Sequence, residues 1–355
     1  MTPLLLSILS TSAAVASTPP ETPAPATAAF IGGLGEAEAT LRAPIAAAER
    51  IIALTRLAVV PAAGDPPTGW ALGATLARYA AAETGDQQRL ESTREYARRK
   101  LAGRPADRIT VDEMIALLSS DAGLIAAACT EAEKIRPPAA VRPVVADLRV
   151  IERLGRFHAL RLGAAVHYNL FLRAQRLAEL VAATYVEKDA VQLWRDLMAA
   201  AAQAERHGNR ARPLRLHADL AADLARLEAS ARDLEAQCCP PAPELLQEKT
   251  WRPLPVAIPP WPRAEILAES GGNGRVTIRL SGAIPKARPT LVLTTPGESG
   301  PQEVPLAQTG TDTLEAVLPA HAAQLEGYVA LHGPDAVRFC PAPWDRPALL
   351  VLGGR

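Results

Sequence analysis

Aromatic residues and net charge are both scarce in this sequence of 355 residues. Phe, Trp and Tyr together make up 4% of the chain, which is too few for the long aromatic platforms on which bases or sugars stack. The 38 Lys and Arg residues cancel the 38 Asp and Glu residues, so no global field attracts nucleic acid or an anionic membrane surface. We therefore expect no nucleic-acid partner, although a local charged patch is compatible with this balance.

The motifs that commonly mark enzymes are also missing. The sequence contains no HExxH or similar histidine pair, no GxSxG and no CxxC. Gly32-Gly33-Leu34-Gly35 follows a Pro-rich segment, whereas a dinucleotide-binding loop needs a strand before it. His158 and His167 are nine positions apart, which places them on opposite sides of one helix. We therefore predict no metal, no cofactor and no catalytic residue, and favour a protein that is not an enzyme.

Cysteine is limited to four residues, Cys129, Cys238, Cys239 and Cys340. An even number of cysteines in an exported chain indicates disulfides. Because a bond between adjacent cysteines closes a strained ring, we predict that Cys238 or Cys239 bonds to Cys129 or Cys340. The alternative is that some of these residues are free, buried thiols.

The first 28 residues indicate export. An apolar run from Leu4 to about Val15 ends in the small-x-small site Ala14-Val15-Ala16, which predicts a signal peptide (residues 1–16) cleaved after Ala16. The run is shorter than the roughly 20 residues that span a bilayer, and no Lys or Arg precedes it. Residues 17–28, rich in Pro, Ala and Thr, predict a linker. No later stretch reaches transmembrane length without charges, so we expect a periplasmic or extracellular protein without an integral membrane segment.

The region from residue 29 to 237 has a helical hydrophobic period. Leu41, Ile45, Ala48 and Ile52 form one stripe, and residues 144–206 predict one helix or two nearly continuous ones. The last helix starts near Pro213 and has apolar residues in steps of three and four, which indicate a packing seam. Its apolar positions are Leu216, Leu220, Leu224, Leu227, Ala231 and Leu234. Several amphipathic helices of this kind predict an α-helical bundle.

The composition changes after residue 237. Residues 238–262 are rich in proline and predict an extended connection. The next predicted domain is residues 263–355, in which the hydrophobic period becomes two from Arg275 onward and about seven short strands alternate with Gly and Pro turns. This pattern predicts a small all-β sandwich of the immunoglobulin or fibronectin type III kind. The expected fold class is therefore α+β multidomain, with the bundle first.

Polar residues within the apolar segment 155–180 are the main site candidates. Apolar residues surround this helix on nearly all sides, so it is predicted to be buried and its polar groups need partners. The candidates are His158, Arg161, His167, Tyr168, Asn169 and Arg173. They form either a ligand pocket between helices or an internal network of hydrogen bonds and ion pairs.

Arginine is in local excess in the same region. The residues are Arg149, Arg153, Arg156, Arg161, Arg173 and Arg176. Such an excess suits an anionic sugar or phosphate. The alternative is that these arginines pair with the acidic residues of the last helix, from Asp219 to Glu235.

Short pieces of the β region match a known kind of protein tail. They are residues 291–293, 304–306, 314–320, 325–331 and 339–341, in which a strand ending at Pro319-Ala320 precedes the strand Leu325-Glu326-Gly327-Tyr328. In these pieces the chain resembles the sandwich tail of large secreted bacterial glycosidase-like proteins, and residues 167–173 resemble the helical region before it. The resemblance covers about half of the chain and implies a carbohydrate-associated, extracytoplasmic role. The chain has no room for a catalytic β/α barrel, so no catalytic residue is carried over.

These observations lead to one expectation and two alternatives. We expect a non-catalytic, exported accessory or binding protein whose partner is extracellular carbohydrate or an envelope protein. The first alternative is a structural or protein-interaction module of the cell envelope, which the apolar seam of the last helix favours. The second is a hydrolase with a site between His158 and Arg173. The sequence leaves the oligomeric state open.

Overall fold

The computed structural model describes residues 38–59, 74–134, 141–207, 216–238, 263–268, 275–281, 288–294, 302–310, 313–318, 324–332, 337–340 and 348–351. The predicted signal peptide, the linker and most of the Pro-rich connection lie outside these residues. By its internal contacts the chain divides into two compact units. The helical unit comprises Met1–Gly85, Ser92–Leu101 and Val111–Val256, and the β unit comprises Asp86–Glu91, Ala102–Thr110 and Ala257–Arg355.

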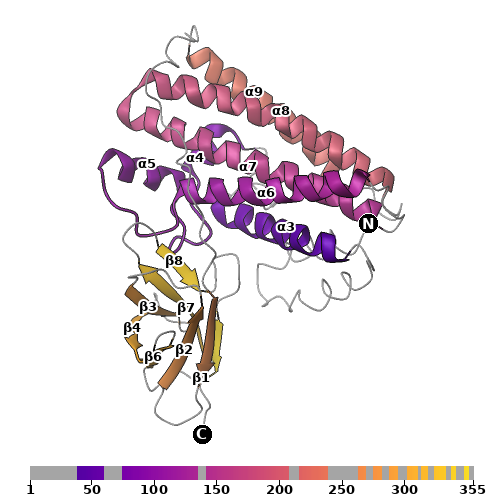
Figure 1. Cartoon of the computed structure of the whole chain (residues 1–355). Helices are drawn as coiled ribbons and strands as arrows, with labels where there is room; N and C mark the ends of the chain where they lie inside the picture. Colours follow the sequence, from indigo (N-terminus) through magenta and orange to yellow (C-terminus); the bar gives the residue numbers. More distant parts are fainter. Residues whose placement is uncertain are drawn as a thin grey trace. The chain divides into compact units, whose positions relative to one another are not determined.

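The helical unit is a bundle, as the sequence predicted. Its helices are α3 (Glu38–Ala58), α4 (Leu76–Ala81), α5 (Thr93–Leu101), α6 (Val111–Lys134), α7 (Arg142–Ala174), α8 (Leu177–His207) and α9 (Leu216–Gln237). The long helix α7 packs against α3, α4, α5, α6 and α8 (Figure 1). This central position explains why α7 buries side chains around its whole circumference.

Two of the predicted apolar stripes are confirmed. In α3, Leu41, Ile45, Ala48 and Ile52 are all buried. The seam of α9 is buried at Leu220, Leu227, Ala231 and Leu234, and α9 packs along α8. The seam that suggested an external partner is therefore covered within the chain itself.

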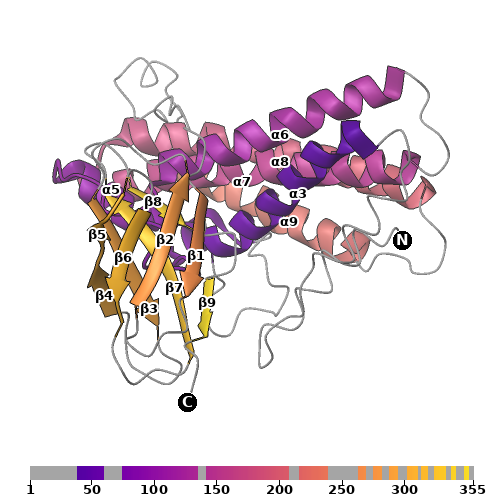
Figure 2. The same cartoon turned by 60° about the horizontal axis from the view of Figure 1, so that its bottom comes forward.

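The segment from residue 144 to 206 is two helices that fold back on one another. Gln175 ends α7 in the left-handed conformation with a φ of 54°, and its N–H bonds to the carbonyl of Phe171. The chain then reverses, so that α8 lies antiparallel along α7 (Figures 1 and 2). Of the two expected arrangements, the pair of nearly continuous helices is confirmed, since only Gln175 and Arg176 separate α7 from α8. The period did not predict the reversal of the chain direction between them, which depends on the positive φ of Gln175.

Aromatic packing joins the helices of this hairpin to α9. Trp194 of α8 is completely buried, and its ring centroid lies 4.7 Å from that of Phe157 on α7. Its indole N–H donates to the carbonyl of Leu220 on α9 over 3.0 Å. Apolar side chains of all three helices surround this pair in one core cluster.

The helix α6 is long and apolar enough to cross a membrane, judged by length and composition among the described residues. The inner helix of a bundle passes the same test, and α6 packs against α3 and α7. It also buries three carboxylates, those of Asp112, Glu113 and Asp121, and Arg50 of α3 binds Asp121 through two nitrogens.

The β unit contains two antiparallel sheets. Its strands are β1 (Arg263–Ala268), β2 (Arg275–Ser281), β3 (Arg288–Thr294), β4 (Gln302–Pro305), β5 (Ala307–Gln308), β6 (Thr313–Val317), β7 (Gln324–His332), β8 (Val337–Cys340) and β9 (Ala348–Val351). One sheet has the order β1-β2-β6-β5 and the other β4-β3-β7-β8, with β9 also paired to β7. Alternate residues of both sheets, including Val276, Ile278, Leu291 and Val329, share one apolar core.

Seven of these strands match the predicted ones, and β1 and β5 were missed. The strand β5 has two residues, which is too short for a period to be visible. Two short segments from the predicted bundle range also group with the β unit. In that unit the guanidinium of Arg89 lies 4.9 Å from the ring centroid of Tyr328, whose hydroxyl donates to Gln88 over 3.1 Å.

Candidate functional site

The six candidate residues of α7 occupy three kinds of environment. His158, Arg161, His167 and Asn169 are buried, Tyr168 is half-buried and Arg173 is exposed. The four buried residues each bond to a neighbouring helix or to the loop before it, as described in the next paragraphs. Their contacts are those of an internal polar network of the helical unit.

An ion pair lies at the centre of this network. Arg161 of α7 and Glu187 of α8 are both completely buried, and the Arg161 guanidinium donates from Nη1 to Oε1 of Glu187. Nη2 of Arg161 donates to the carbonyl of Ala74 just before α4 over 2.6 Å. The guanidinium also lies over the ring of Tyr79, 4.6 Å from its centroid. Arg161 therefore links α7 to α4 and α8 at one buried point.

Burial dominates the protonation of the residues around this ion pair. The Tyr79 hydroxyl lies 3.0 Å from Nδ1 of His158. Burial, with a contribution from the nearby Arg161, lowers the pKa of His158 to about 3. Burial also raises the pKa of Tyr79 and of Glu187, and Arg161 opposes both shifts. His158 is therefore neutral in the folded protein at physiological pH, next to the cation of Arg161.

The buried imidazole predicts that stability falls in mild acid. An unfolded histidine binds a proton near pH 6.5, whereas His158 in the folded protein does so only near pH 3. Between these values the unfolded state holds more protons, so the free energy of unfolding falls as the pH falls, by at most about 1.4 kcal/mol per pH unit. We expect His158→Gln to remove this contribution, as measured by urea unfolding at a series of pH values. Equal pH slopes for both proteins would contradict the assignment.

Two further buried residues, His167 and Asn169, attach the end of α7 to its neighbours. Nδ1 of His167 lies 2.6 Å from Oε2 of Glu179 on α8. The Asn169 amide donates to the carbonyl of Ala80 over 2.9 Å and to the hydroxyl of Thr93 over 3.1 Å. These bonds attach the last turns of α7 to α8 on one side and to α4 and α5 on the other.

The predicted pairing of the α7 arginines with the last helix was wrong for the arginines whose partners are described. Arg149 binds Glu133 of α6, whereas Arg153 and Arg156 both bind Glu152 of α7 itself. On α9, Glu228 and Glu235 instead pair with Arg195 and Lys188 of α8. The physical reason is that α9 packs along α8, whereas α7 is covered by α6 and α8.

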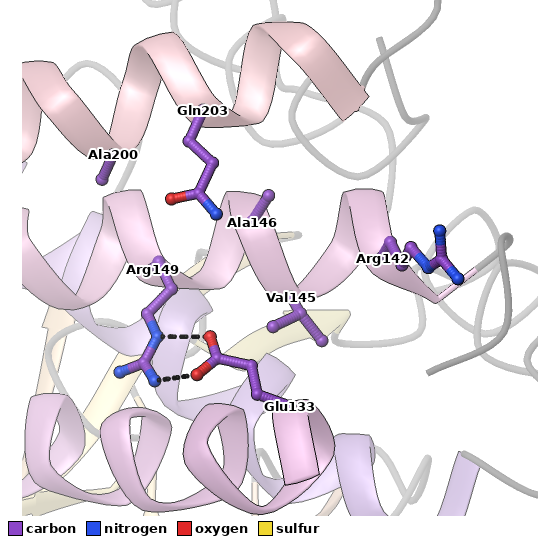
Figure 3. A pocket seen from close by; sticks show the side chains of 7 residues that line it. All are labelled: Glu133, Arg142, Val145, Ala146, Arg149, Ala200 and Gln203. Carbon is purple, nitrogen blue, oxygen red and sulfur yellow. Dashed lines mark hydrogen bonds and ion pairs between the residues drawn. The ribbon is translucent and has the colours of Figure 1, made fainter. Parts of the chain in front are cut away.

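A surface groove crosses α6, α7 and α8 near the start of α7 (Figure 3). It has a volume of about 100 Å³ and is lined by Glu133, Arg142, Val145, Ala146, Arg149, Ala200 and Gln203. Pockets for drug-sized ligands measure roughly 300–1,000 Å³. This groove therefore accommodates one charged group or the edge of a single ring, and a longer ligand would extend along the surface.

The groove combines polar donors with an apolar floor. The Arg149 guanidinium binds Glu133 through Nε at 3.2 Å and Nη2 at 3.0 Å, and Nη2 also donates to Thr130 at 3.1 Å. Glu133 raises the pKa of Arg149 through these bonds. Figure 3 shows the Gln203 side chain reaching from α8 toward α7 beside Ala146, and the Arg142 guanidinium directed away from the ion pair.

Local electrostatics favour an anion at this place. The groove has two cationic residues, Arg142 and Arg149, and one anionic residue, Glu133. It also lies beside the first turns of α7, whose N-cap residue Val141 makes no side-chain capping bond. The amide groups and the dipole of a helix N-terminus attract negative charge. The sequence highlighted only Arg149 here, because Gln203 lies on another helix more than 50 positions away.

The described cysteines are free thiols. Cys129 and Cys238 are both buried. The sulfur of Cys129 lies 3.8 Å from the carbonyl oxygen of Val145, and the sulfur of Cys238 lies 3.2 Å from the hydroxyl of Thr184. Burial raises the pKa of Cys129 to about 12, which makes its thiol unreactive at neutral pH. The side chains of Cys239 and Cys340 lie outside the described part, so a disulfide between them stays a prediction. Among the described residues no group of three His, Cys, Asp or Glu residues could hold a metal ion.

Comparisons with known proteins give little similarity. No protein-family model matches the chain, and no curated protein matches it. A solved structure of a glycoside hydrolase family 138 enzyme that targets pectin rhamnogalacturonan II is similar with a TM-score of 0.47 and 11% sequence identity. The match covers 91% of this chain and 46% of that one, so the chain spans less than half of the length of that enzyme.

Proposed function

We propose that this chain is a non-catalytic, exported accessory protein that binds acidic carbohydrate in the groove across α6, α7 and α8. The groove is the observation that carries the proposal. Two arginines, Arg142 and Arg149, and the amide of Gln203 line it together with the apolar side chains of Val145, Ala146 and Ala200. Saccharides present hydroxyl groups along their edges and C–H groups on their faces, so this combination suits a sugar with a carboxylate.

The size and charge of the groove narrow the ligand class. A uronic acid residue matches one small site with a positive balance, because its carboxylate accepts from guanidinium and amide donors. The Glu133 carboxylate holds Arg149 in place and can accept a hydrogen bond from a sugar hydroxyl. The remaining units of an oligosaccharide would lie on the surface outside the groove.

The proposed type of β unit and the proposed location fit such a role. The strand order β1-β2-β6-β5 opposite β4-β3-β7-β8 supports an immunoglobulin or fibronectin type III sandwich. These sandwiches commonly serve as accessory modules of surface proteins. The apolar run before Ala14-Val15-Ala16 supports export.

Removing the donors of the groove is expected to weaken binding. We expect the double variant Arg142→Ala with Gln203→Ala to reduce the affinity for galacturonate oligosaccharides by about tenfold, since each lost hydrogen bond contributes about 0.5–1.5 kcal/mol. Isothermal titration calorimetry of the full chain measures this effect. A neutral galactose oligosaccharide of equal length provides the comparison ligand.

The control variant is Arg195→Ala, which removes an exposed arginine of α8 that pairs with Glu228 and does not line the groove. Its affinity should equal that of the unmodified chain. The proposal fails if no oligosaccharide binds, or if Arg195→Ala lowers the affinity as much as the groove variant does. Equal affinity for the neutral oligosaccharide would contradict the acidic specificity.

A further inference from the structure

One end of the helical unit gathers exposed arginines from three helices. The bonds from Asn169 to Ala80 and Thr93 bring the end of α4 and the start of α5 against the last turn of α7. At this end α7 turns into α8 through Gln175, and α5 lies beside that turn (Figures 1 and 2). Within the segments 76–85, 92–101 and 168–187 the exposed charged side chains are arginines: Arg78, Arg94, Arg98, Arg173 and Arg176.

The acidic residues of the same surface are fewer than its arginines and less exposed than they are. Glu83 and Glu95 are half-buried, where Glu83 pairs with Arg94 and Glu95 accepts from the backbone and hydroxyl of Ser92. Glu179 and Glu187 are buried. The outward charge of this end is therefore positive, although the chain as a whole is neutral.

Exposed leucines accompany these arginines. Leu172 and Leu177 are 49% and 44% exposed, and they lie on either side of the turn at Gln175. Leu101, at the end of α5, is 49% exposed. These three are among the few large apolar side chains that the described residues leave exposed.

We propose that this end, which we call the basic tip (Arg94, Arg98, Leu172, Arg173, Arg176 and Leu177), binds the surface of an anionic lipid membrane. Basic side chains near a charged bilayer are attracted to the lipid phosphates, and apolar side chains between them enter the boundary of the headgroup layer. Long arginine side chains keep their guanidinium at the headgroups while the leucines reach deeper.

The placement of the leucines at a turn favours a lipid surface over an acidic protein or a nucleic acid. Leu172 and Leu177 lie on two adjacent helix ends, so both can enter a bilayer without any change of the fold. A soluble polyanion would match the arginines but would leave the leucines in water. The basic tip and the groove use different residues, so this inference does not depend on the proposed carbohydrate site.

Co-sedimentation of the full chain with vesicles tests the proposal. We expect binding to phosphatidylcholine vesicles that contain phosphatidylglycerol, and weaker binding to phosphatidylcholine alone. Since each basic residue near the surface contributes about 1 kcal/mol, Arg98→Gln with Arg173→Gln should lower the partition coefficient by roughly 25-fold. Added salt should also lower it, because the Debye length falls to about 3 Å at 1 M. Any vesicle binding by the apolar run near the N-terminus is the same in every variant, so differences in the partition coefficient between variants report on the basic tip.

Two sets of variants separate the charge from the apolar contribution. Leu172→Ser with Leu177→Ser should weaken binding to both kinds of vesicle. The matched controls are Arg195→Gln with Arg206→Gln, which remove exposed arginines further along α8, and Leu124→Ser, which removes an exposed leucine of α6.

Three results would overturn the proposal. The first is absence of binding to the anionic vesicles, and the second is an equal loss of binding in the control variants. The third is retention on dextran sulfate without any vesicle binding, which would assign the basic tip to a soluble acidic polymer instead.

Discussion

Replacing Glu187 by alanine is expected to lower the free energy of unfolding of the helical unit by about 3–5 kcal/mol. The substitution leaves the guanidinium of Arg161 completely buried without its counter-ion, in contact with the carbonyl of Ala74 and the rings of Tyr79 and Phe157. Burying an unpaired cation costs far more than removing both charges together. Urea unfolding followed by the helical circular dichroism signal measures the effect.

Two companion variants test the electrostatic cause. Glu187→Gln keeps the shape and removes only the charge, so it should cost nearly as much as Glu187→Ala. The double variant Arg161→Met with Glu187→Leu removes both charges and should recover most of the stability, because apolar side chains of similar volume often replace a buried ion pair without loss. A double variant less stable than Glu187→Ala would show that the ion pair is not the source of the loss.

Replacing Trp194 by alanine is the second substitution with a large expected effect, also about 3–5 kcal/mol. The indole is completely buried, packs against Phe157 and joins three helices through its bond to Leu220. Its removal opens a cavity among helices that already contact one another on every side, so the neighbours relax only in part. The midpoint of urea unfolding of the helical unit should fall, while the β unit should keep its resistance to proteolysis.

The control for this prediction is Trp194→Phe. It keeps most of the ring and loses the hydrogen bond to Leu220, so we expect a cost of about 1–2 kcal/mol. An alanine variant no less stable than the phenylalanine variant would contradict the central position of Trp194 in the core.

The thiols Cys129 and Cys238 should stay unmodified by iodoacetamide in the folded protein, because both are buried.

Residue patterns predicted part of the candidate site, namely which residues of α7 would need partners. The apolar surroundings of residues 155–180 predicted that His158, Arg161 and Asn169 need partners, and the structure supplies them. The identity of those partners was not predictable. Glu187 is 26 positions from Arg161 and Ala80 is 89 positions from Asn169, and nothing local in the sequence relates them.

The groove and the basic tip could be predicted from the sequence even less than the buried network. Each is assembled from helices that meet only after folding, such as α6 with α8 at the groove and α5 with the α7–α8 turn at the basic tip. The neutral total charge of the sequence did not indicate the basic tip, because the acidic residues that balance its arginines are buried, half-buried or located elsewhere in the chain.

The sequence by itself determined the division into a helical region and a β region, because hydrophobic periods of about 3.6 and 2 are properties of neighbouring residues. It likewise determined the buried stripes of α3 and α9. Only the tertiary structure decided that the chain reverses at Gln175, that α7 pairs with α6 and α8, and that residues 86–91 group with the β unit. These features depend on which distant segments lie side by side, and a local period carries no information about that.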